Sequence, residues 1–533
     1  MGNAQNKWLD LVVYEVYLRS FADGNGDGIG DLRGLREKLD YLQELGVNAV
    51  WITPCYESPD VDNGYDISNY FTIDKKYGTL DEWKELVADM HARGMKIIMD
   101  LVVNHTSDKH EWFVQGRTSK NNPYHDYYLW ADEPKTSWGS TFGGSAWEYN
   151  EPTGEYYLHL FAKEQPDLNW ENEQLREEVR KIVDFWVDLG VDGFRCDVLD
   201  HISKDFEKGT FTEGPHLHEY LRELFNRENM KNVFTVGECS SGFENISKIC
   251  GKDRGELTCI FQFDHIGLGR KNKWEPGEFR LRELRDIFIN WQNFCAKQDL
   301  IYTLFTDNHD QARFADRLCI DRLKYYEKAT CIAATTFLLK GIPFLYQGQE
   351  FGMRNDYKSN VRDFDDVETK GYYADYKGQV SKKEMLKRIN YGSRDNARCP
   401  LAWTKSSANG YGFGSNAPWI SINVHAGEQN LEVDREREKS IFKFYQEMLA
   451  IRKKFSAIRY GEFENHSGEK NAFIFTRTYQ GERALVICNY EERQTIALPS
   501  GQWDLVLTNR VEKKEKENEW EFEPYEIAVY IEK

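Results

Sequence analysis

The sequence predicts an α/β protein: a (β/α)8 barrel, the TIM-barrel architecture, with a small domain inserted after the third strand and an antiparallel β-sandwich at the C-terminus. Strand-like and helix-like segments alternate along most of the 533 residues, which is typical of a parallel sheet covered by helices. A long stretch rich in Trp, Tyr, Gly and Asn interrupts this alternation, and strand patterns without helices begin near Gly461. We therefore expect the barrel at 1–103 and 173–460, the inserted domain at 104–172 and the sandwich at 461–533.

In the first half of the barrel, three apolar segments have the pattern of buried strands: Val12–Leu18, Ala49–Thr53 and Lys96–Val103. An amphipathic helix is expected at Leu35–Leu45, between the first two strands. Thr79 followed by Glu82 forms a capping box, which predicts a second helix that ends at Gly94.

Later segments continue the alternation. The apolar residues of Leu175–Leu189 recur at helical spacing, and Gly190 ends that helix. The strands expected after it are Gly193–Val198, Val233–Gly237, Leu300–Thr306 and Ile342–Tyr346. Near the C-terminus, Ala472–Tyr479 and Ala484–Tyr490 alternate as strands of an antiparallel sheet do.

Composition limits the possible partners. The formal net charge of −19 would repel nucleic acid and an anionic membrane surface. It fits a soluble enzyme with a neutral substrate, although an acidic composition also serves solubility alone. The apolar fraction of 40% and aromatic fraction of 14% suffice for a large core. We expect neither nucleic acid nor a membrane as a partner, and composition leaves the oligomeric state open between a monomer and a dimer.

The cysteines point to a reducing compartment. Ten are scattered along the chain without a C-x-x-C pair or zinc-type spacing, and several lie in apolar runs. The segment Met1–Asp10 has no apolar signal-peptide core, and no apolar run reaches the ~18 residues of a membrane span. We expect a cytoplasmic protein; a signal peptide that was already removed is the alternative.

Three carboxylates follow strand-like segments: Asp197, Glu238 and Asp310. The carboxyl ends of barrel strands are where such a fold keeps its chemistry. A single acid there could equally cap a helix, but three acids with Arg195 and His309 close by favour one site. Glycoside hydrolysis needs one ionised and one protonated carboxyl group across the scissile bond. The positive charge of Arg195, two residues before Asp197, is expected to keep that carboxylate ionised.

Five segments resemble the signature blocks of glycoside hydrolase family 13, the alpha-amylase clan, and within it the oligo-1,6-glucosidase/dextran glucosidase group. The segments are Asp100–His105, Gln165–Asn169, Gly193–Asp197, Val236–Glu238 and Asn308–Asp310. Any one of them alone would be weak, but five in the family's order are highly specific. The similarity extends from about Lys7 to Trp403, and it is weaker in the C-terminal region.

The resemblance implies a role for each acid. Asp197 is the nucleophile, Glu238 is the general acid/base, and Asp310 is the third acid, which holds the sugar hydroxyls and helps to distort the ring. His105 and His309 are implied to donate hydrogen bonds to the glucosyl unit at the cleavage site.

Other residues resemble the family's pocket for a terminal sugar. An Asp62–Arg398 ion pair is implied at its blind end, with Tyr65 stacked beneath the glucose. Phe161 and Gln165 match further pocket residues of the group. Because a pocket closed at one end admits only chain ends, we expect an exo-acting enzyme.

The segment Asp23–Asp31 presents oxygen ligands at every second residue among glycines, as the first part of a calcium loop does. It is not an EF-hand, because Gly34 stands where that loop needs its last acid. The resemblance implies a structural calcium ion far from the chemistry, with the ligands Asp23, Asn25, Asp27, Ile29 and Asp31. An Asx-rich turn without a metal is the alternative.

The chain departs from the group's pattern at three places. The segment Cys239–Gly242 lacks the Thr-Trp that commonly follows the acid/base, where the Trp helps to form a wall for the leaving sugar. The segment Cys399–Ala402 and Cys196 also differ from the usual residues. These changes spare the catalytic carboxylates and bear on the leaving-group preference.

Together these features predict an exo-acting, retaining alpha-glucosidase that removes the non-reducing terminal glucose of short alpha-glucosides. Val198 follows the nucleophile, and in the resembling group a valine there accompanies alpha-1,6 preference, so isomaltose and isomalto-oligosaccharides are the expected substrates. Trehalose-6-phosphate hydrolase, sucrose hydrolase or isomerase, and transglucosidase are alternatives in the same family. Non-enzymatic transporter heavy chains of this fold have a membrane helix and have lost catalytic acids, whereas this chain retains all three.

Overall fold

The computed structural model describes residues 4–239, 242–250, 256–318, 324–497, 500–510 and 519–533. Its central strands are β1 (Val13–Val16), β2 (Ala49–Ile52), β5 (Lys96–Leu101), β9 (Gly193–Cys196), β10 (Phe234–Glu238), β11 (Cys259–Phe261), β14 (Thr303–Leu304) and β15 (Ile342–Tyr346). They form one sheet in the order β11-β10-β9-β5-β2-β1-β15-β14, and each paired neighbour runs parallel. The end strands β11 and β14 contact each other, so the sheet nearly closes into the predicted barrel.

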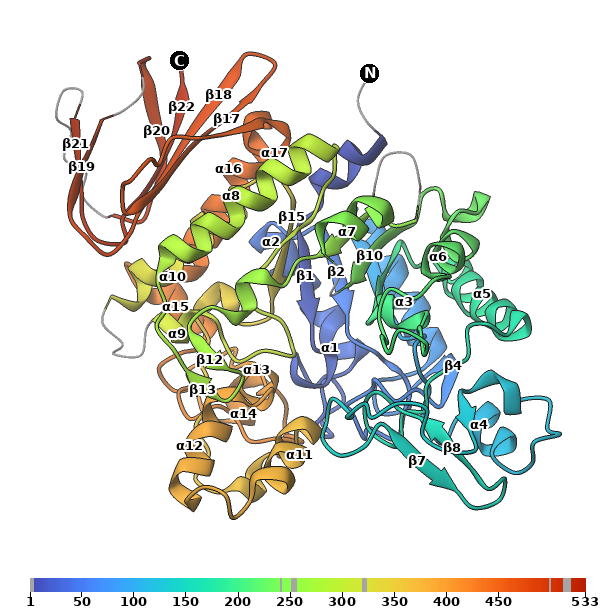
Figure 1. Cartoon of the computed structure of the whole chain (residues 1–533). Coiled ribbons are helices and arrows are strands. Elements are labelled where there is room, and N and C mark those ends of the chain that lie inside the picture. The colour runs from blue at the N-terminus through green and yellow to red at the C-terminus, as the bar shows by residue number, and fades with distance from the viewer. Residues whose placement is uncertain (1–3, 240–241, 251–255, 319–323, 498–499, 511–518) are drawn as a thin grey trace.

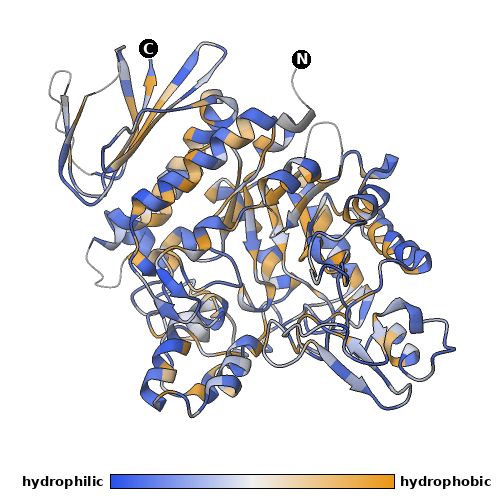
Figure 2. Ribbon diagram, in the orientation of Figure 1, coloured by the Kyte–Doolittle hydropathy of each residue, from blue (hydrophilic) through white to orange (hydrophobic). Residues whose placement is uncertain are grey.

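Helices connect the strands and cover the barrel, as Figure 1 shows. In chain order they are α1 (Leu32–Glu37), α2 (Leu39–Leu45), α3 (Leu80–Ala92), α5 (Glu173–Asp188), α6 (Leu217–Phe225), α7 (Phe243–Cys250), α8 (Leu281–Gln298), α10 (Tyr325–Phe337) and α16 (Ile441–Lys454). In α5, for example, Leu175, Val179 and Ile182 lie on one buried face. Figure 2 shows the result, with apolar residues gathered on the strands and inner helix faces and polar residues outside.

Most predicted elements occur, with three differences. The predicted helix Leu35–Leu45 is two helices, α1 and α2, because Lys38 leaves helical geometry. The leucines on both sides of this break face the core, so their spacing could not reveal it. Of the predicted strand Leu300–Thr306, only Thr303–Leu304 forms a strand, which is β14. Strand β11 was missed because three residues are too few for a periodic pattern.

The capping box is confirmed. The Thr79 side chain accepts a hydrogen bond from the backbone N–H of Glu82, and the Glu82 carboxylate accepts one from the backbone N–H of Thr79. Gly94, with φ of 69°, follows the end of α3 and allows the chain to turn into β5.

The region 104–172 contains α4 (Glu111–Gly116) and a three-stranded antiparallel sheet of β6 (Trp130–Ala131), β8 (Glu155–Leu158) and β7 (Trp147–Asn150). The loop after β11 carries the hairpin β12 (Arg270–Asn272) and β13 (Glu275–Pro276). Helices α11 (Val367–Tyr376) and α12 (Lys382–Gly392) follow β15. Figure 1 shows all three additions at the same end of the barrel.

The C-terminal region has two facing sheets. The larger has the order β16 (Glu462–Asn465), β17 (Ala472–Tyr479), β18 (Glu482–Asn489), β22 (Ile527–Glu532), β20 (Trp503–Thr508). The smaller pairs β19 (Gln494–Ala497) with β21 (Glu519–Phe522). Ile496 and Phe522 of the small sheet pack with Ile474 and Ile487 of the large one, as in a sandwich.

The sequence predicted buried cysteines and no membrane-spanning segment. The nine described cysteines are buried and none of them is in a disulfide bond, and Cys319 lies outside the described residues. Among the residues that the structure describes, no helix is both long and apolar enough to span a membrane.

Candidate active site

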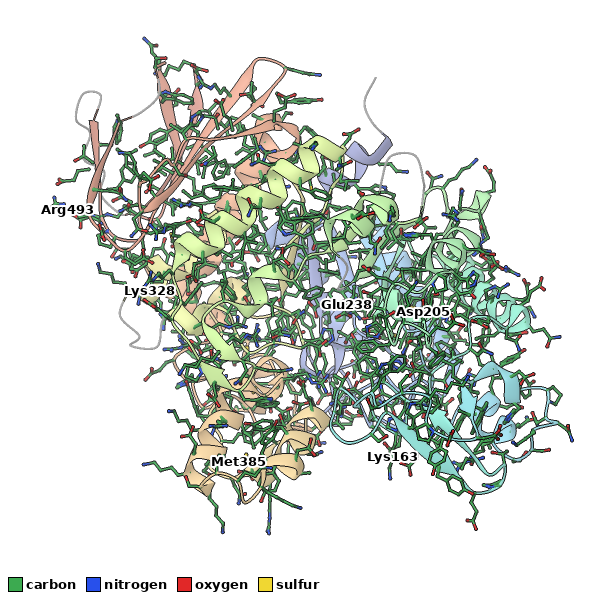
Figure 3. All side chains as sticks on the ribbon, viewed as in Figure 1. Lys163, Asp205, Glu238, Lys328, Met385 and Arg493 are labelled. Carbon is green, nitrogen blue, oxygen red and sulfur yellow. The ribbon has the colours of Figure 1, made fainter. Side chains whose placement is uncertain are left out.

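A pocket of about 170 Å³ opens at the carboxyl ends of the barrel strands. This is smaller than the ~300–1,000 Å³ of sites for drug-sized ligands, and it suits a single sugar ring. Eight of the predicted site residues line it: Asp62, Tyr65, His105, Phe161, Asp197, Val198, Glu238 and Asp310. Figure 3 shows Glu238 near the middle of the molecule, at the barrel.

Arg195 holds three carboxylates of this pocket together. Its side chain projects to the same side of β9 as that of Asp197, because residues two apart on a strand share a face. One nitrogen, Nη1, donates to Asp197 Oδ1 at 2.8 Å and to Asp100 Oδ1 at 2.9 Å. The other, Nη2, donates to Glu238 Oε2. Asp197 and Glu238 are thus joined by the two arms of a single guanidinium.

Opposing effects act on the pKa of Asp197. Burial raises the pKa of Asp197 well above its ordinary value; Arg195 opposes this shift, whereas Glu238, Asp100 and Asp310 add to it. Arg195 therefore acts in the expected direction, towards the ionised carboxylate, against its burial and the neighbouring acids.

A chain of charged groups lies behind the third acid. His309 Nδ1 is 2.6 Å from Glu15 Oε1, and His309 Nε2 is 3.1 Å from Asp310 Oδ2. Although burial lowers the pKa of His309, Asp310 and Glu15 more than offset this and raise it to about 9. Burial alone would raise the pKa of Asp310, but His309, Arg394 and Arg398 hold it well below its ordinary value. At neutral pH His309 is therefore an imidazolium between two carboxylates.

The predicted Asp62–Arg398 pair is wrong. Asp62 instead pairs with Arg394, whose Nη2 lies 2.8 Å from Asp62 Oδ1. Arg394 also contacts Asp310 at 3.1 Å and Asp366 at 2.8 Å. Arg398 is fully buried behind Asp310, to which its Nη2 donates at 2.9 Å. The two arginines are one helical turn apart around α13 (Asp395–Arg398), so both approach Asp310 from the same side.

The remaining predicted residues build the pocket wall. The ring of Tyr65 stacks on His309 with centroids 5.2 Å apart, and its hydroxyl donates to Asp100 Oδ2 at 2.9 Å. Gln165 lies behind the wall, fully buried, and donates to Asp62 Oδ2 at 3.3 Å. His105 is 3.0 Å from the carbonyl of Tyr65, and burial lowers the pKa of His105. Phe161 packs against His105.

Val198 has an unusual backbone conformation for a branched residue. Its φ of 34° and ψ of 47° lie in the left-handed region. For a β-branched residue this costs about 1–3 kcal/mol and occurs where surrounding structure enforces it. The constraint fixes the Val198 side chain in the wall of the pocket, immediately after Asp197.

Several residues of the site were not predicted. Thr141, Phe142, Lys273, Glu368 and Arg394 also line the pocket, and Glu15 and Asp366 support it from behind. Glu15 had a visible signal, a charged residue inside an otherwise apolar strand. The others come from segments far apart in sequence, most of them loops, where no local pattern marks them.

The cysteines at the three places that depart from the group's pattern are buried. Cys239, Cys196 and Cys399 are 4%, 0% and 0% exposed. Ser240 and Ser241, which follow Cys239, lie outside the described residues. Neither Cys239 nor Gly242 has an aromatic side chain that could form a wall of the pocket beside Glu238.

The Asp23–Asp31 loop is folded around its carboxylates. Asp23 accepts hydrogen bonds from the backbone N–H groups of Gly26, Asp27 and Gly28, and Asp31 accepts from Gly34 at the start of α1. An ionised carboxylate offers about four acceptor positions, so these bonds leave room for a cation. In the part of the chain that the structure describes, no three His, Cys, Asp or Glu side chains already converge as a metal cluster.

Comparisons with known proteins agree with this geometry. The model of the alpha-amylase catalytic domain matches residues 15–461. An oligo-1,6-glucosidase of Heyndrickxia coagulans is 42% identical, and the match covers 98% of this chain and 99% of that protein.

Two solved structures are also similar. The trehalose-6-phosphate hydrolase of Bacillus licheniformis is 36% identical, with a TM-score of 0.90 and coverage of 99% of this chain and 100% of that one. The isomaltulose synthase of Erwinia rhapontici, solved in complex with sucrose, is 37% identical, with a TM-score of 0.92 and coverage of 98% of both chains.

Proposed function

The chain belongs to the alpha-amylase family and is a glycoside hydrolase, and on this basis we propose that it is an exo-acting, retaining alpha-glucosidase specific for alpha-1,6-linked glucosides. The observation that carries the proposal is the pair Asp197 and Glu238, joined by Arg195 beside a pocket whose other end is closed by Asp62 and Arg394. The relatives named oligo-1,6-glucosidase support the linkage.

The two acids act in a double displacement. Asp197 attacks the anomeric carbon while Glu238 gives its proton to the leaving oxygen, which forms a covalent glucosyl-enzyme. Glu238 then takes a proton from water, and that water releases glucose with its original anomeric configuration. Direct attack needs carboxylates about 5–5.5 Å apart, whereas inversion needs ~6.5–9.5 Å. Bonding to a single guanidinium supports the shorter spacing.

The reaction needs one ionised and one protonated acid. Arg195 favours the ionised form of Asp197, against the burial and the neighbouring acids that raise its pKa. Protonation of the leaving oxygen requires the proton to reside on Glu238 once substrate is bound.

The closed end makes the enzyme exo-acting. Asp62 and Arg394 fill the space beyond the first sugar ring, and Asp366 fixes Arg394 from behind at 2.8 Å. Their hydrogen-bonding groups suit the hydroxyls at the non-reducing end of a terminal glucose. A continuous glucan chain cannot pass this barrier.

A neutral substrate fits better than trehalose-6-phosphate. Among the described residues, the cations lining the pocket are Lys273 and Arg394. Lys273 is paired with Glu368, and Arg394 with Asp62, Asp310 and Asp366. A phosphate would have to displace one of these carboxylates, which favours an uncharged sugar.

Calcium is the proposed structural ion of the Asp23–Asp31 loop. Asp23, Asn25, Asp27, the carbonyl of Ile29 and Asp31 would supply the hard oxygen ligands that calcium prefers. The glycines at positive φ, Gly26 and Gly28, let the loop curl around such an ion. The ion would stabilise the fold and take no part in the reaction.

A reducing, cytoplasmic location is proposed from the thiols. All nine described cysteines are buried thiols outside disulfide bonds, and several have a pKa raised by burial, as for Cys55 and Cys239. Fractionation of the native host would test this location.

A substrate panel tests the function. Isomaltose should be cleaved with a higher kcat/KM than maltose, sucrose, trehalose or trehalose-6-phosphate. Faster cleavage of trehalose-6-phosphate would replace the proposal with the phosphohydrolase alternative. Products larger than the substrate would identify a transglucosidase, and trehalulose or isomaltulose from sucrose an isomerase.

A further inference from the structure

A cavity beside the β12–β13 hairpin contains two adjacent arginines that pair with no carboxylate among the described residues, and we propose that it is a phosphate-binding site. The ligand is inorganic phosphate or the phosphate group of a small ester. The inference goes beyond the proposed glucosidase function, because this phosphate takes no part in the hydrolysis. We call the space the hairpin cavity; its lining includes Arg270, Lys273, Trp274, Arg317, Lys387 and Tyr391.

The hairpin cavity measures about 210 Å³ and lies between the β12–β13 hairpin, α9 (Ala315–Leu318) and α12. Within the part of the chain that the structure describes, its lining contains no catalytic carboxylate and no residue of the inserted region 104–172. Lys273 lines both the hairpin cavity and the catalytic pocket, so the hairpin forms the wall between them. Figure 1 shows the hairpin between α9 and α12.

Arg270 and Arg317 hold their guanidinium groups close together. The carbonyl of Ile266 accepts a hydrogen bond from Arg270 Nε at 2.7 Å and another from Arg317 Nη1 at 2.6 Å. Arg270 also donates to Gln311 Oε1 at 2.7 Å. Arg317 also donates to the carbonyl of Leu268 at 3.1 Å. All of these acceptors are neutral, so two positive charges lie side by side without a counter-ion from the described residues.

Burial makes this arrangement unfavourable in the absence of an anion. Arg317 is only 8% exposed. Its burial and the neighbouring charge of Arg270 lower the pKa of Arg317 to about 9, and burial also lowers the pKa of Arg270. Buried charges in proteins normally have a partner of opposite sign. An anion bound between the two guanidinium groups would supply that partner.

The acids that line the hairpin cavity are already paired. Glu275 and Glu384 both bond to Arg388, at 2.9 and 3.2 Å. Asp316 bonds to Arg354 at 2.6 Å. The lining has five basic and three acidic side chains, a formal charge of +2, whereas the chain as a whole carries −19. The cavity is therefore a positive site on an acidic protein, and it favours an anionic ligand.

The donors that remain suit phosphate. Arg270 Nη1 and Arg317 Nε and Nη2 form no hydrogen bond with the residues that the structure describes. The planar donors of arginine match the oxygen atoms of phosphate in pairs. Lys387 is exposed at the same cavity and adds a third cation without an ion pair to a described residue.

The hairpin cavity also has room for the carbon part of an ester. It is larger than the catalytic pocket of about 170 Å³, which suits one sugar ring. The rings of Trp274 and Tyr391 line it, and the hydroxyl of Tyr391 donates to the carbonyl of Gly269 at 2.9 Å. Flat ring faces suit the C–H groups of a small organic phosphate.

Calorimetric titration of the full chain with inorganic phosphate, and separately with glucose 6-phosphate, tests the site. At least one of them should bind one-to-one with a Kd of about 1 mM or lower, as expected for two charge-assisted contacts. Tighter binding of the ester would identify an organic phosphate as the ligand, and equal binding would identify the phosphate group alone. Absence of saturable binding of both would overturn the inference.

Charge-removing variants locate the bound phosphate. Arg270→Gln should weaken binding at least about tenfold, the size of one charge-assisted contact. Lys387→Ala, at an exposed position that should not disturb the fold, should weaken it as well. Lys271→Gln is the matched control, because Lys271 is exposed on β12 but does not line the hairpin cavity; it should keep the wild-type Kd. Unchanged affinity in both Arg270→Gln and Lys387→Ala would contradict the proposed site.

Competition separates this site from the catalytic pocket. Asp197→Asn saturated with isomaltose should bind phosphate with the same Kd as without the sugar, because the two ligands occupy different cavities. A Kd that rises in proportion to the isomaltose concentration would place the phosphate in the catalytic pocket and overturn the inference. The titrations of the wild type use no glucoside, so their outcome does not depend on the proposed reaction.

Discussion

Two buried arginines organise the acids of the site. Arg195 contacts Asp100, Asp197 and Glu238, and a second arginine, Arg394, contacts Asp62, Asp310 and Asp366. Each guanidinium presents several donors in a fixed plane, so it sets the positions of its carboxylates as well as their charge. Removing either arginine would take away the positive charge that several buried acids share, which is costly.

Val198 is the residue expected to select the linkage. Its side chain lies in the wall next to Asp197. We expect it to crowd a leaving sugar attached directly through its ring, whereas the extra methylene of a 1,6 bond would move that sugar away. The preference for isomaltose over maltose should be about 10–200-fold in kcat/KM. Val198→Ala should narrow it.

The stability of this variant provides a control. Alanine tolerates the left-handed backbone better than valine, so the melting temperature of Val198→Ala should not fall. A wild-type enzyme that cleaves maltose faster than isomaltose would refute the role of Val198.

The Glu15–His309 pair predicts a pH dependence of stability. The pKa of His309 is raised to about 9, so its protonation stabilises the fold fully below its ordinary pKa of ~6.5, and this stabilisation is lost as pH rises through about 9. In Glu15→Gln the pKa of His309 should be lower. Urea unfolding at pH 6.5 and pH 9 should then show a smaller loss of stability with pH in the variant, by about 1–2 kcal/mol.

Glu350→Gln is a suitable comparison. Glu350 is also fully buried, but the side chains that donate to it are Tyr14 and Tyr41, and not a histidine. The Glu350→Gln variant should be less stable than the wild type, but its loss of stability between pH 6.5 and pH 9 should equal that of the wild type. Identical pH profiles for Glu15→Gln and the wild type would contradict the pairing.

Residues inside sequence blocks were predicted well, and residues that depend on tertiary contacts were not. Asp197, Glu238 and Asp310 do converge on one pocket. The arginine at the closed end was predicted to be Arg398, but it is Arg394, one helical turn earlier. Local sequence cannot show which of two arginines on one helix face reaches Asp62. Asp366 and Lys273 come from loops whose positions only the fold determines.

At the scale of elements, periodic segments were predicted and short ones were not. Helix α5 buries five apolar residues on one face, and β15 is apolar along its whole length. In contrast β11 and β14 have three and two residues, and their pairing with neighbouring strands defines them. Short strands carry too little pattern to be recognised alone.

The Asp23–Asp31 loop should make stability depend on calcium. An ion that binds only the folded state adds about 2.7 kcal/mol at a concentration 100 times its Kd. Chelation should therefore lower the melting temperature. It should leave turnover at low temperature nearly unchanged, because the loop lines no part of the catalytic pocket.

Asp27→Ala is the variant of choice for this loop. Asp27 is exposed, whereas Asp31 also caps α1, so replacing Asp31 would damage the helix directly. Chelator should not lower the melting temperature of Asp27→Ala further. Immediate loss of activity in chelator, with the fold intact, would contradict a purely structural ion.

At the scale of the whole molecule, the C-terminal sheets share a core with the barrel. Phe473 and Phe475 of β17 belong to the same apolar cluster as the barrel helices. Arg477 is fully buried and donates to the carbonyl of Leu338 at 3.3 Å. Removal of these sheets would uncover apolar surface and leave buried polar groups unpaired.

A chain that ends at Tyr460 is therefore expected to be insoluble or to lose cooperative thermal unfolding. Circular dichroism and a melting curve, measured against the full chain, would check this. A soluble truncated protein with the melting temperature of the full chain would show that the two regions are independent.

We propose that Asp197 and Glu238 carry out a retaining hydrolysis of alpha-1,6-glucosides, and the anomer released first from isomaltose tests this most directly. Proton NMR at early times should show alpha-glucose appearing before mutarotation, and Asp197→Asn should abolish the signal while its circular dichroism stays that of the wild type. Beta-glucose as the first product would contradict the double displacement, and so would full activity in Asp197→Asn.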